Sequence, residues 1–122
     1  MDKIELQERL KQFALRIINL VDHMPHRISA DAISRQIIRS GTSPSANYRA
    51  ACIAKSEKDF MNKMKMVEEE LDETSHWLML IMESQMLPKE RVRPLYEENL
   101  ELLKINISAL KTMREKINDK KK

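Results

Sequence analysis

The sequence contains very little glycine, cysteine or aromatic residue. Its 122 residues include one Gly, one Cys and 4% aromatic residues. One cysteine permits neither a disulfide within the chain nor a cysteine-based zinc site, and one glycine cannot build a glycine-rich phosphate-binding loop. No apolar run approaches the roughly 20 residues of a membrane span, and the charged, periodic N-terminus is unlike a secretory signal peptide. We therefore expect a cytoplasmic protein with no membrane partner.

Charged residues and helical periodicity are what the sequence has in quantity. Charged residues make up 34% of the chain, and the net charge is +3. Apolar residues recur at spacings of three and four, which is typical of amphipathic helices. The predicted helices cover residues 2–24, about 29–54, 57–85 and 88–118. Ser56, with Asp59 three residues later, predicts the N-cap of the third helix. We predict an all-α, up-and-down four-helix bundle that forms a single domain over residues 1–122.

The second predicted helix contains two residues that interrupt helices. Gly41 is the only glycine, and a glycine inside a helix costs about 1 kcal/mol relative to alanine. Pro44 lacks an N–H but suits a first helical position, and Ser43 before it is a good N-cap. We therefore predict that the second helix is broken at Gly41–Pro44, with one piece ending near Ser40 and another running from Pro44 to about Ala54.

An acidic run at residues 68–73 predicts a polar link between the second and third helices. Most of these carboxylates are expected in solvent, but helical spacing puts Glu70 and Glu73 near the apolar stripe. Buried carboxylates need partners. Arg39 is the natural partner and Asn47 a second one, so we predict an internal polar network of these four residues in which Arg39 forms an ion pair with Glu70 or Glu73.

The third predicted helix carries a second apolar stripe beside the first, so its apolar surface is wider than one packed face requires. It consists of Met79, Met82 and Met86. Methionine adapts to irregular contacts. We interpret these three residues as a candidate interface between copies of the chain.

One stretch of the chain resembles a known family. It comprises QIIRSGTSPSAN at residues 36–47, then Ala50, Ala51, Cys52, Ser56, Asp59 and Phe60, and ELDETSHWL at residues 70–78. This pattern is similar to the small bacterial four-helix-bundle proteins named for the 23S rRNA intervening sequences that encode them. His76 departs from it, because the family often has an aromatic residue before the tryptophan. The resemblance covers nearly the whole chain and implies a homopentameric ring. Similar accessory proteins of diversity-generating retroelements form basic pentamers that work with RNA and a reverse transcriptase.

Basic residues gather around the predicted break and near the C-terminus. The candidate nucleic-acid-binding residues are Arg35, Arg49, Lys55, Lys58, Lys111 and Arg114. Such side chains supply contacts to phosphates. The sequence places no aromatic platform among them, which argues against stacking of single-stranded bases. The alternative is that these charges serve only solubility.

Three functions remain open from the sequence. The first is a non-enzymatic homo-oligomer that binds RNA or a nucleoprotein. The second is a structural or partner-binding scaffold without nucleic acid. The third is a di-metal carboxylate enzyme, because Glu73 and His76 form an E-x-x-H pair; di-iron bundles need this pair twice, and it occurs here once. We therefore expect no catalytic residue, metal or cofactor.

Overall fold

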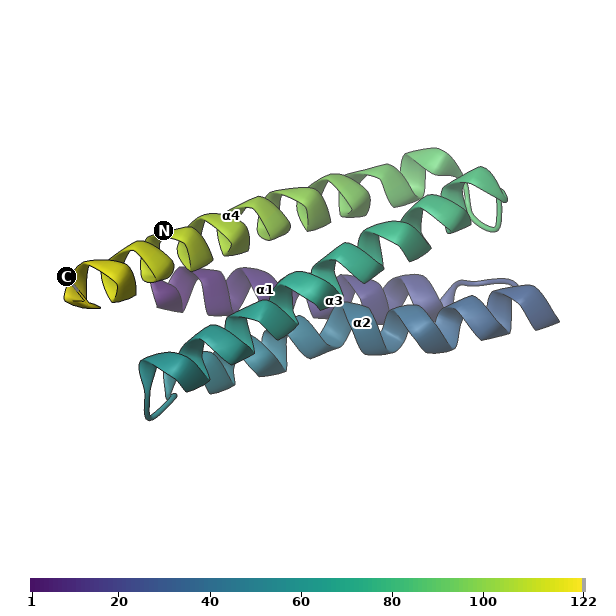
Figure 1. The fold of residues 1–122 in the computed structure, drawn as a ribbon. Coiled ribbons are helices and arrows are strands. Elements are labelled where there is room, and N and C mark those ends of the chain that lie inside the picture. The colour runs from purple at the N-terminus through teal and green to yellow at the C-terminus, as the bar shows by residue number, and fades with distance from the viewer. Residues whose placement is uncertain (122) are drawn as a thin grey trace.

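The computed structural model describes residues 1–121 as four antiparallel helices with no strand among them. The helices are α1 (Lys3–Asp22), α2 (Ile28–Cys52), α3 (Glu57–Glu83) and α4 (Lys89–Lys121). Short turns connect them, so each helix runs back along the one before it (Figure 1). The predicted all-α, up-and-down four-helix bundle is therefore confirmed. Along residues 1–121, no helix combines the length and apolarity needed to cross a membrane.

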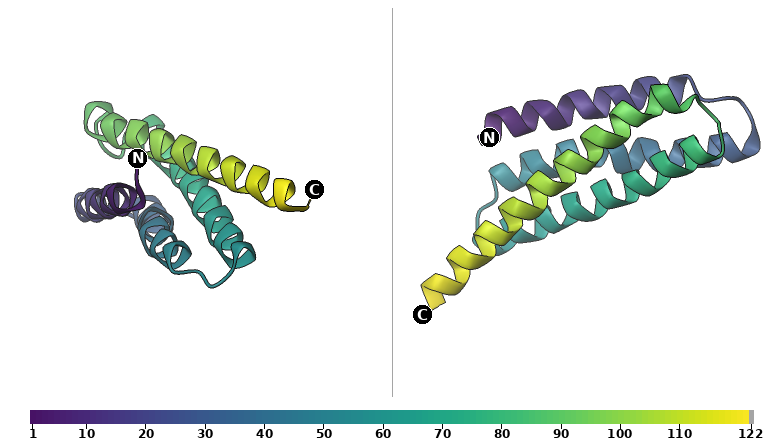
Figure 2. Two further views of the ribbon diagram at one scale, coloured as in Figure 1. Left: turned by 90° about the vertical axis from the view of Figure 1, so that its left-hand side faces the viewer. Right: turned by 90° about the horizontal axis from the view of Figure 1, so that it is seen from above.

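Helix α4 diverges from α1 as α4 approaches its own C-terminal end. It has 33 residues, whereas α1 has 20, a difference of about 20 Å at 1.5 Å per residue. Figure 2 shows its last turns extending past the N-terminus of α1 and the start of α3. A hollow of about 540 Å³ lies where the helices separate, between Leu6, Tyr48, Phe60 and the C-terminal half of α4. The last turns of α4 therefore have few packed neighbours.

The predicted break in α2 is wrong, because this helix is continuous from Ile28 to Cys52. Gly41 is buried and faces α1. A Cβ atom at this position would lie 2.7 Å from Cγ1 and 2.9 Å from Cγ2 of Ile17. The glycine thus allows α1 and α2 to pack closely, and this contact offsets its poor helix propensity.

Pro44 lies inside α2 without interrupting the helix. Its missing N–H leaves the carbonyl of Ser40 without the usual helical donor. On the turn before it, the Thr42 hydroxyl donates to the carbonyl of Ile38 at 2.5 Å, and the Ser43 hydroxyl donates to the carbonyl of Arg39 at 2.6 Å. Such bonds to the fourth preceding carbonyl accompany helix bending. Ser43 is therefore not an N-cap, whereas the predicted N-cap of α3 is confirmed: Ser56 Oγ accepts from the Asp59 amide at 3.0 Å.

Two asparagines of α4 lie in the core between apolar side chains. Asn99 is 0% exposed and Asn106 is 2% exposed. The Asn99 amide donates to the carbonyl of Leu71 at 2.8 Å and to Ser75 Oγ at 2.6 Å. The Asn106 amide donates to the carbonyl of Met64 at 3.0 Å. Neither side-chain oxygen has a hydrogen-bond partner within residues 1–121. These buried amides join α4 to α3 at two points seven residues apart.

We predict that Gly41→Ala lowers the free energy of unfolding by about 1–3 kcal/mol, the usual cost of overpacking a core. Helix propensity alone predicts a gain of about 1 kcal/mol. Cγ1 and Cγ2 of Ile17 branch directly from its Cβ, so only a change of χ1 or a shift of α1 moves them away from the new methyl group, and isoleucine in a helix strongly prefers one χ1 rotamer. Urea denaturation followed by circular dichroism measures the change.

A second variant isolates this contact. In an Ile17→Ala background the three atoms that crowd position 41 are gone, and adding Gly41→Ala should be neutral or stabilising. If Gly41→Ala stabilises the wild-type chain as well, the packing role of the glycine is refuted.

We also predict that Asn106→Leu raises the free energy of unfolding by about 1 kcal/mol. A leucine of similar size removes the unpartnered oxygen, and the Met64 carbonyl keeps its helical donor. Asn106→Ala, which leaves a void, should instead destabilise the bundle. Thermal and urea unfolding of both variants test this, and a less stable leucine variant would count against it.

Candidate nucleic-acid interface

Formal charge is distributed very unevenly along the chain. Residues 1–53 contain eight basic and five acidic residues, a net charge of +3. Residues 54–66 contain four basic and two acidic residues, a net charge of +2. Residues 67–103 contain three basic and ten acidic residues, a net charge of −7. Residues 104–122 contain seven basic and two acidic residues, a net charge of +5. Since α3 and α4 are antiparallel, the start of α3 lies beside the end of α4 (Figure 1). The two basic segments of this hairpin therefore meet at one end of the bundle.

The first turns of α3 and the last turns of α4 enclose a hollow of about 570 Å³, which we call the basic hollow. Its cationic lining residues are Lys58, Lys65, Arg114 and Lys121. Met61 and Ile117 provide apolar surface, and Asn62 and Asn118 provide amides. On its rim, Glu57 forms an ion pair with Lys120.

The structure brings together two of the candidates chosen from the sequence. Lys58 and Arg114 line the basic hollow, together with Lys65 and Lys121, which the sequence analysis did not select. Helical spacing was the available signal, because Arg114 and Lys121 lie seven residues apart on one face of α4. Lys111 is exposed one turn before Arg114.

Like Lys111, the remaining three candidates lie outside the basic hollow. Lys55 lines a neighbouring hollow beside Lys3 and Glu57. Arg49 is exposed in the last turn of α2, close to this end of the bundle. Arg35 lies 17 residues before the end of α2 at Cys52, about 25 Å away along the helix. The structure therefore does not place Arg35 with the other cations.

Two aromatic side chains lie next to the basic hollow. Tyr48 and Phe60 line the two neighbouring hollows. Tyr48 is only 7% exposed, and its burial, followed by its contact with Cys52, raises the pKa of its hydroxyl above the ordinary value. The phenol is therefore uncharged at neutral pH.

The four residues of the predicted polar network join α2 to α3 in two separate contacts. Arg39 pairs with Glu73, whose Oε2 also accepts from Trp77 Nε1 at 3.0 Å. Asn47 donates to Glu70 Oε1 at 2.6 Å. The Arg39 and Glu73 side chains are 51% and 36% exposed, so the pair is not internal as expected. Exposed ion pairs contribute about 0–1 kcal/mol.

The buried polar contact between these two helices is made by Ser40 and Thr74. Both residues are 0% exposed, and their hydroxyl oxygens lie 2.8 Å apart. The sequence analysis did not pair them. The signal was a threonine at a position of the α3 apolar stripe, where a polar side chain needs a partner.

The three methionines of the predicted interface differ in exposure. Met79 is 38% exposed, whereas Met82 and Met86 are half-buried and pack against the core. Only Met79 presents substantial apolar surface outwards.

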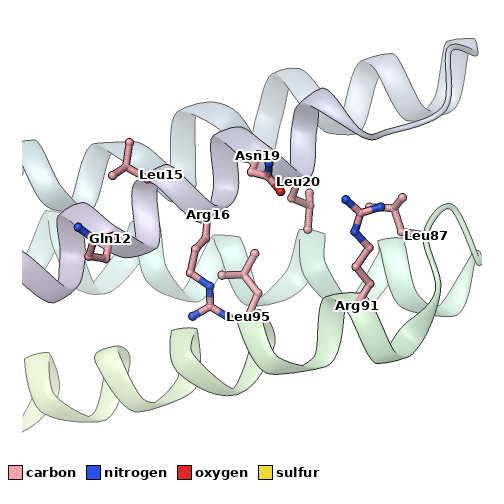
Figure 3. Close-up of a pocket in the computed structure, with 8 residues that line it drawn as sticks. All are labelled: Gln12, Leu15, Arg16, Asn19, Leu20, Leu87, Arg91 and Leu95. Atoms are coloured by element: carbon pink, nitrogen blue, oxygen red, sulfur yellow. The ribbon is translucent and has the colours of Figure 1, made fainter.

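A further hollow, of about 270 Å³, lies between α1 and α4 near the α3–α4 turn, and we call it the α1–α4 hollow (Figure 3). This hollow was not predicted from the sequence. It is lined by Gln12, Leu15, Arg16, Asn19, Leu20, Leu87, Arg91 and Leu95. Farther along α1, Arg9 bridges to Glu98 at 2.5 Å and Glu101 at 3.3 Å, and the Glu98 carboxylate raises the pKa of Arg9. By contrast, Arg16 and Arg91 form no ion pair within residues 1–121.

The E-x-x-H pair of α3 lies among other contacts. Glu73 bonds to Arg39 and Trp77, and the His76 ring packs edge-on against Trp77 with ring centroids 5.1 Å apart. In the part of the chain that the structure describes, no three His, Cys, Asp or Glu side chains gather as a group that could hold a metal ion.

Comparison with known proteins identifies relatives of this chain. Residues 2–108 match the model of the 23S rRNA-intervening sequence protein family. A crystal structure of a protein of unknown function from the S23 ribosomal protein family of Bacteroides thetaiotaomicron superimposes with a TM-score of 0.84. That protein is 33% identical, and the match covers 91% of this chain and 99% of the other. No curated protein matches the chain.

Proposed function

The chain belongs to the 23S rRNA-intervening sequence protein family, and on this premise we propose that it is a non-enzymatic, self-associating bundle whose basic end binds RNA in the cytoplasm. The observation that carries the proposal is the meeting of two basic segments of sequence in the basic hollow. The net charge of the whole chain is only +3, so the local concentration of positive charge is the distinctive feature.

The basic hollow suits a phosphate backbone better than a single small anion. Its four cations come from two helices and surround about 570 Å³ of accessible space, and each one that neutralises a phosphate releases a counterion. Asn62 and Asn118 add neutral donors and acceptors in the same hollow. Such groups bond to ribose hydroxyls, which distinguish RNA from DNA.

Self-association strengthens this interaction. The family resemblance implies five copies in a ring, and five chains of charge +3 carry +15 together. Several basic ends held in one assembly bind a single RNA with an affinity above that of one end, because the later contacts form at a high effective concentration.

A partner-binding scaffold without nucleic acid is the second candidate. The observation in its favour is the net charge of −7 on residues 67–103, which is suited to a basic protein surface. A scaffold of this kind has no measurable affinity for RNA even at low salt.

The proposal predicts binding of a structured RNA hairpin that weakens steeply with salt. We expect Lys58→Gln/Arg114→Gln to weaken binding about tenfold or more at low salt and to reduce the slope of log K against log[salt] by about two, one unit per lost phosphate contact. Filter binding or fluorescence anisotropy across a salt series measures both quantities.

The matched control is Lys89→Gln/Arg93→Gln, which makes the same charge change at the opposite end of the bundle, where both residues are exposed. Its slope should stay close to that of the wild type. Equal losses in the two variants would show that net charge alone matters, and an absence of binding at low salt would favour the scaffold.

A further inference from the structure

We propose that the α1–α4 hollow receives the outward face of α3 from a second copy of this chain. The contact is head-to-tail, since each copy offers the hollow to one neighbour and its α3 face to another. This inference rests on the self-association in the proposed function and identifies the two surfaces that carry it.

The receiving surface combines exposed apolar groups with two unpaired cations. Leu15 and Ile18 of α1 are 51% and 40% exposed. Arg16 reaches from α1 towards α4, and Arg91 reaches from α4 towards α1 (Figure 3). Neither guanidinium has a carboxylate partner within residues 1–121. Arginine beside apolar surface is typical of the centres of protein–protein interfaces.

The floor of the α1–α4 hollow is apolar. It is formed by Leu20, Leu87 and Leu95, which are between 4% and 7% exposed. Because these leucines are already buried, apolar side chains of a partner would cover the exposed Leu15 and Ile18, and its carboxylates would meet the two arginines.

The outward face of α3 has this chemistry. Met66 and Met79 are 43% and 38% exposed. Between them, Glu69 and Asp72 are exposed and form no ion pair in the part of the chain that the structure describes. The spacings of three, three and seven residues keep all four side chains on one side of the helix. The face thus presents two carboxylates between two flexible apolar groups.

The two surfaces turn away from each other within one copy. Helix α1 lies alongside α2 and α4, and α3 lies alongside the same two helices, whereas no Cα atom of α1 lies within 8 Å of one in α3. They are therefore diagonal in the bundle, and their outer faces point in different directions. A contact between unlike faces of identical chains repeats from copy to copy and closes into a ring when the rotation permits.

Charge complementarity selects a second copy as the occupant. Within residues 1–121, Arg16 and Arg91 form no ion pair, and neither do Glu69 and Asp72, so the contact satisfies both pairs at once. It leaves the basic hollow free, because neither Lys58 nor Arg114 belongs to either surface. RNA binding and self-association can thus operate together.

Charge reversal with rescue tests this contact. Arg16→Glu/Arg91→Glu and Glu69→Arg/Asp72→Arg should each weaken self-association about tenfold or more, because like charges then face each other. A chain that carries all four substitutions should recover the mass of the wild-type assembly, because every contact then again joins opposite charges. Light scattering coupled to gel filtration measures the mass, and circular dichroism checks that each variant is folded.

The control is Arg35→Glu/Arg49→Glu, which makes the same charge change on the exposed surface of α2 and should leave the mass unchanged. An oligomeric wild type whose mass resists both reversals would overturn these two surfaces while leaving self-association in place. A wild type with the mass of one chain would overturn both. Loss without rescue in the chain that carries all four substitutions would overturn the pairing of the hollow with α3.

Discussion

The close contact between Gly41 of α2 and Ile17 of α1 is the constraint on which the arrangement of the helices depends. A Cβ at position 41 would lie 2.7 Å from the Ile17 side chain, so every other residue type forces the two helices apart. This contact sets the position of α2 in the bundle. Helix α2 in turn holds α3 through the buried hydroxyls of Ser40 and Thr74, and α3 holds α4 through two buried amides.

The number and the approximate bounds of the helices could be predicted because the apolar period of a helix is encoded locally. The continuity of α2 could not. Gly41 and Pro44 both indicate a break when they are read alone. For Gly41, the compensation comes from a side chain on another helix, Ile17. Packing between elements distant in sequence decided the outcome.

The candidate site, like the fold, could be predicted from the sequence only in part. The contact between Arg39 and Glu73 could be predicted because both lie at helical spacings from core positions of adjacent helices. The grouping of Lys58 with Arg114 depends on how far α4 extends past α3 (Figure 2), and the α1–α4 hollow depends on two helices far apart in the sequence. The bundle thus separates an acidic middle from a basic end, and this polarity links the proposed self-association to the proposed RNA binding.

The two core asparagines have a consequence for the basic hollow. Asn99 and Asn106 meet the Leu71 and Met64 carbonyls, so both pairs are seven residues apart. If α4 slid along α3 by one turn, about 5.4 Å, both amides would leave these acceptors together. A buried amide left without a hydrogen bond costs about 1–3 kcal/mol. The two amides therefore help to hold α4 at a fixed axial position relative to α3. The spacing of the cations at the open end of this hairpin therefore depends on two buried contacts that lie several turns away.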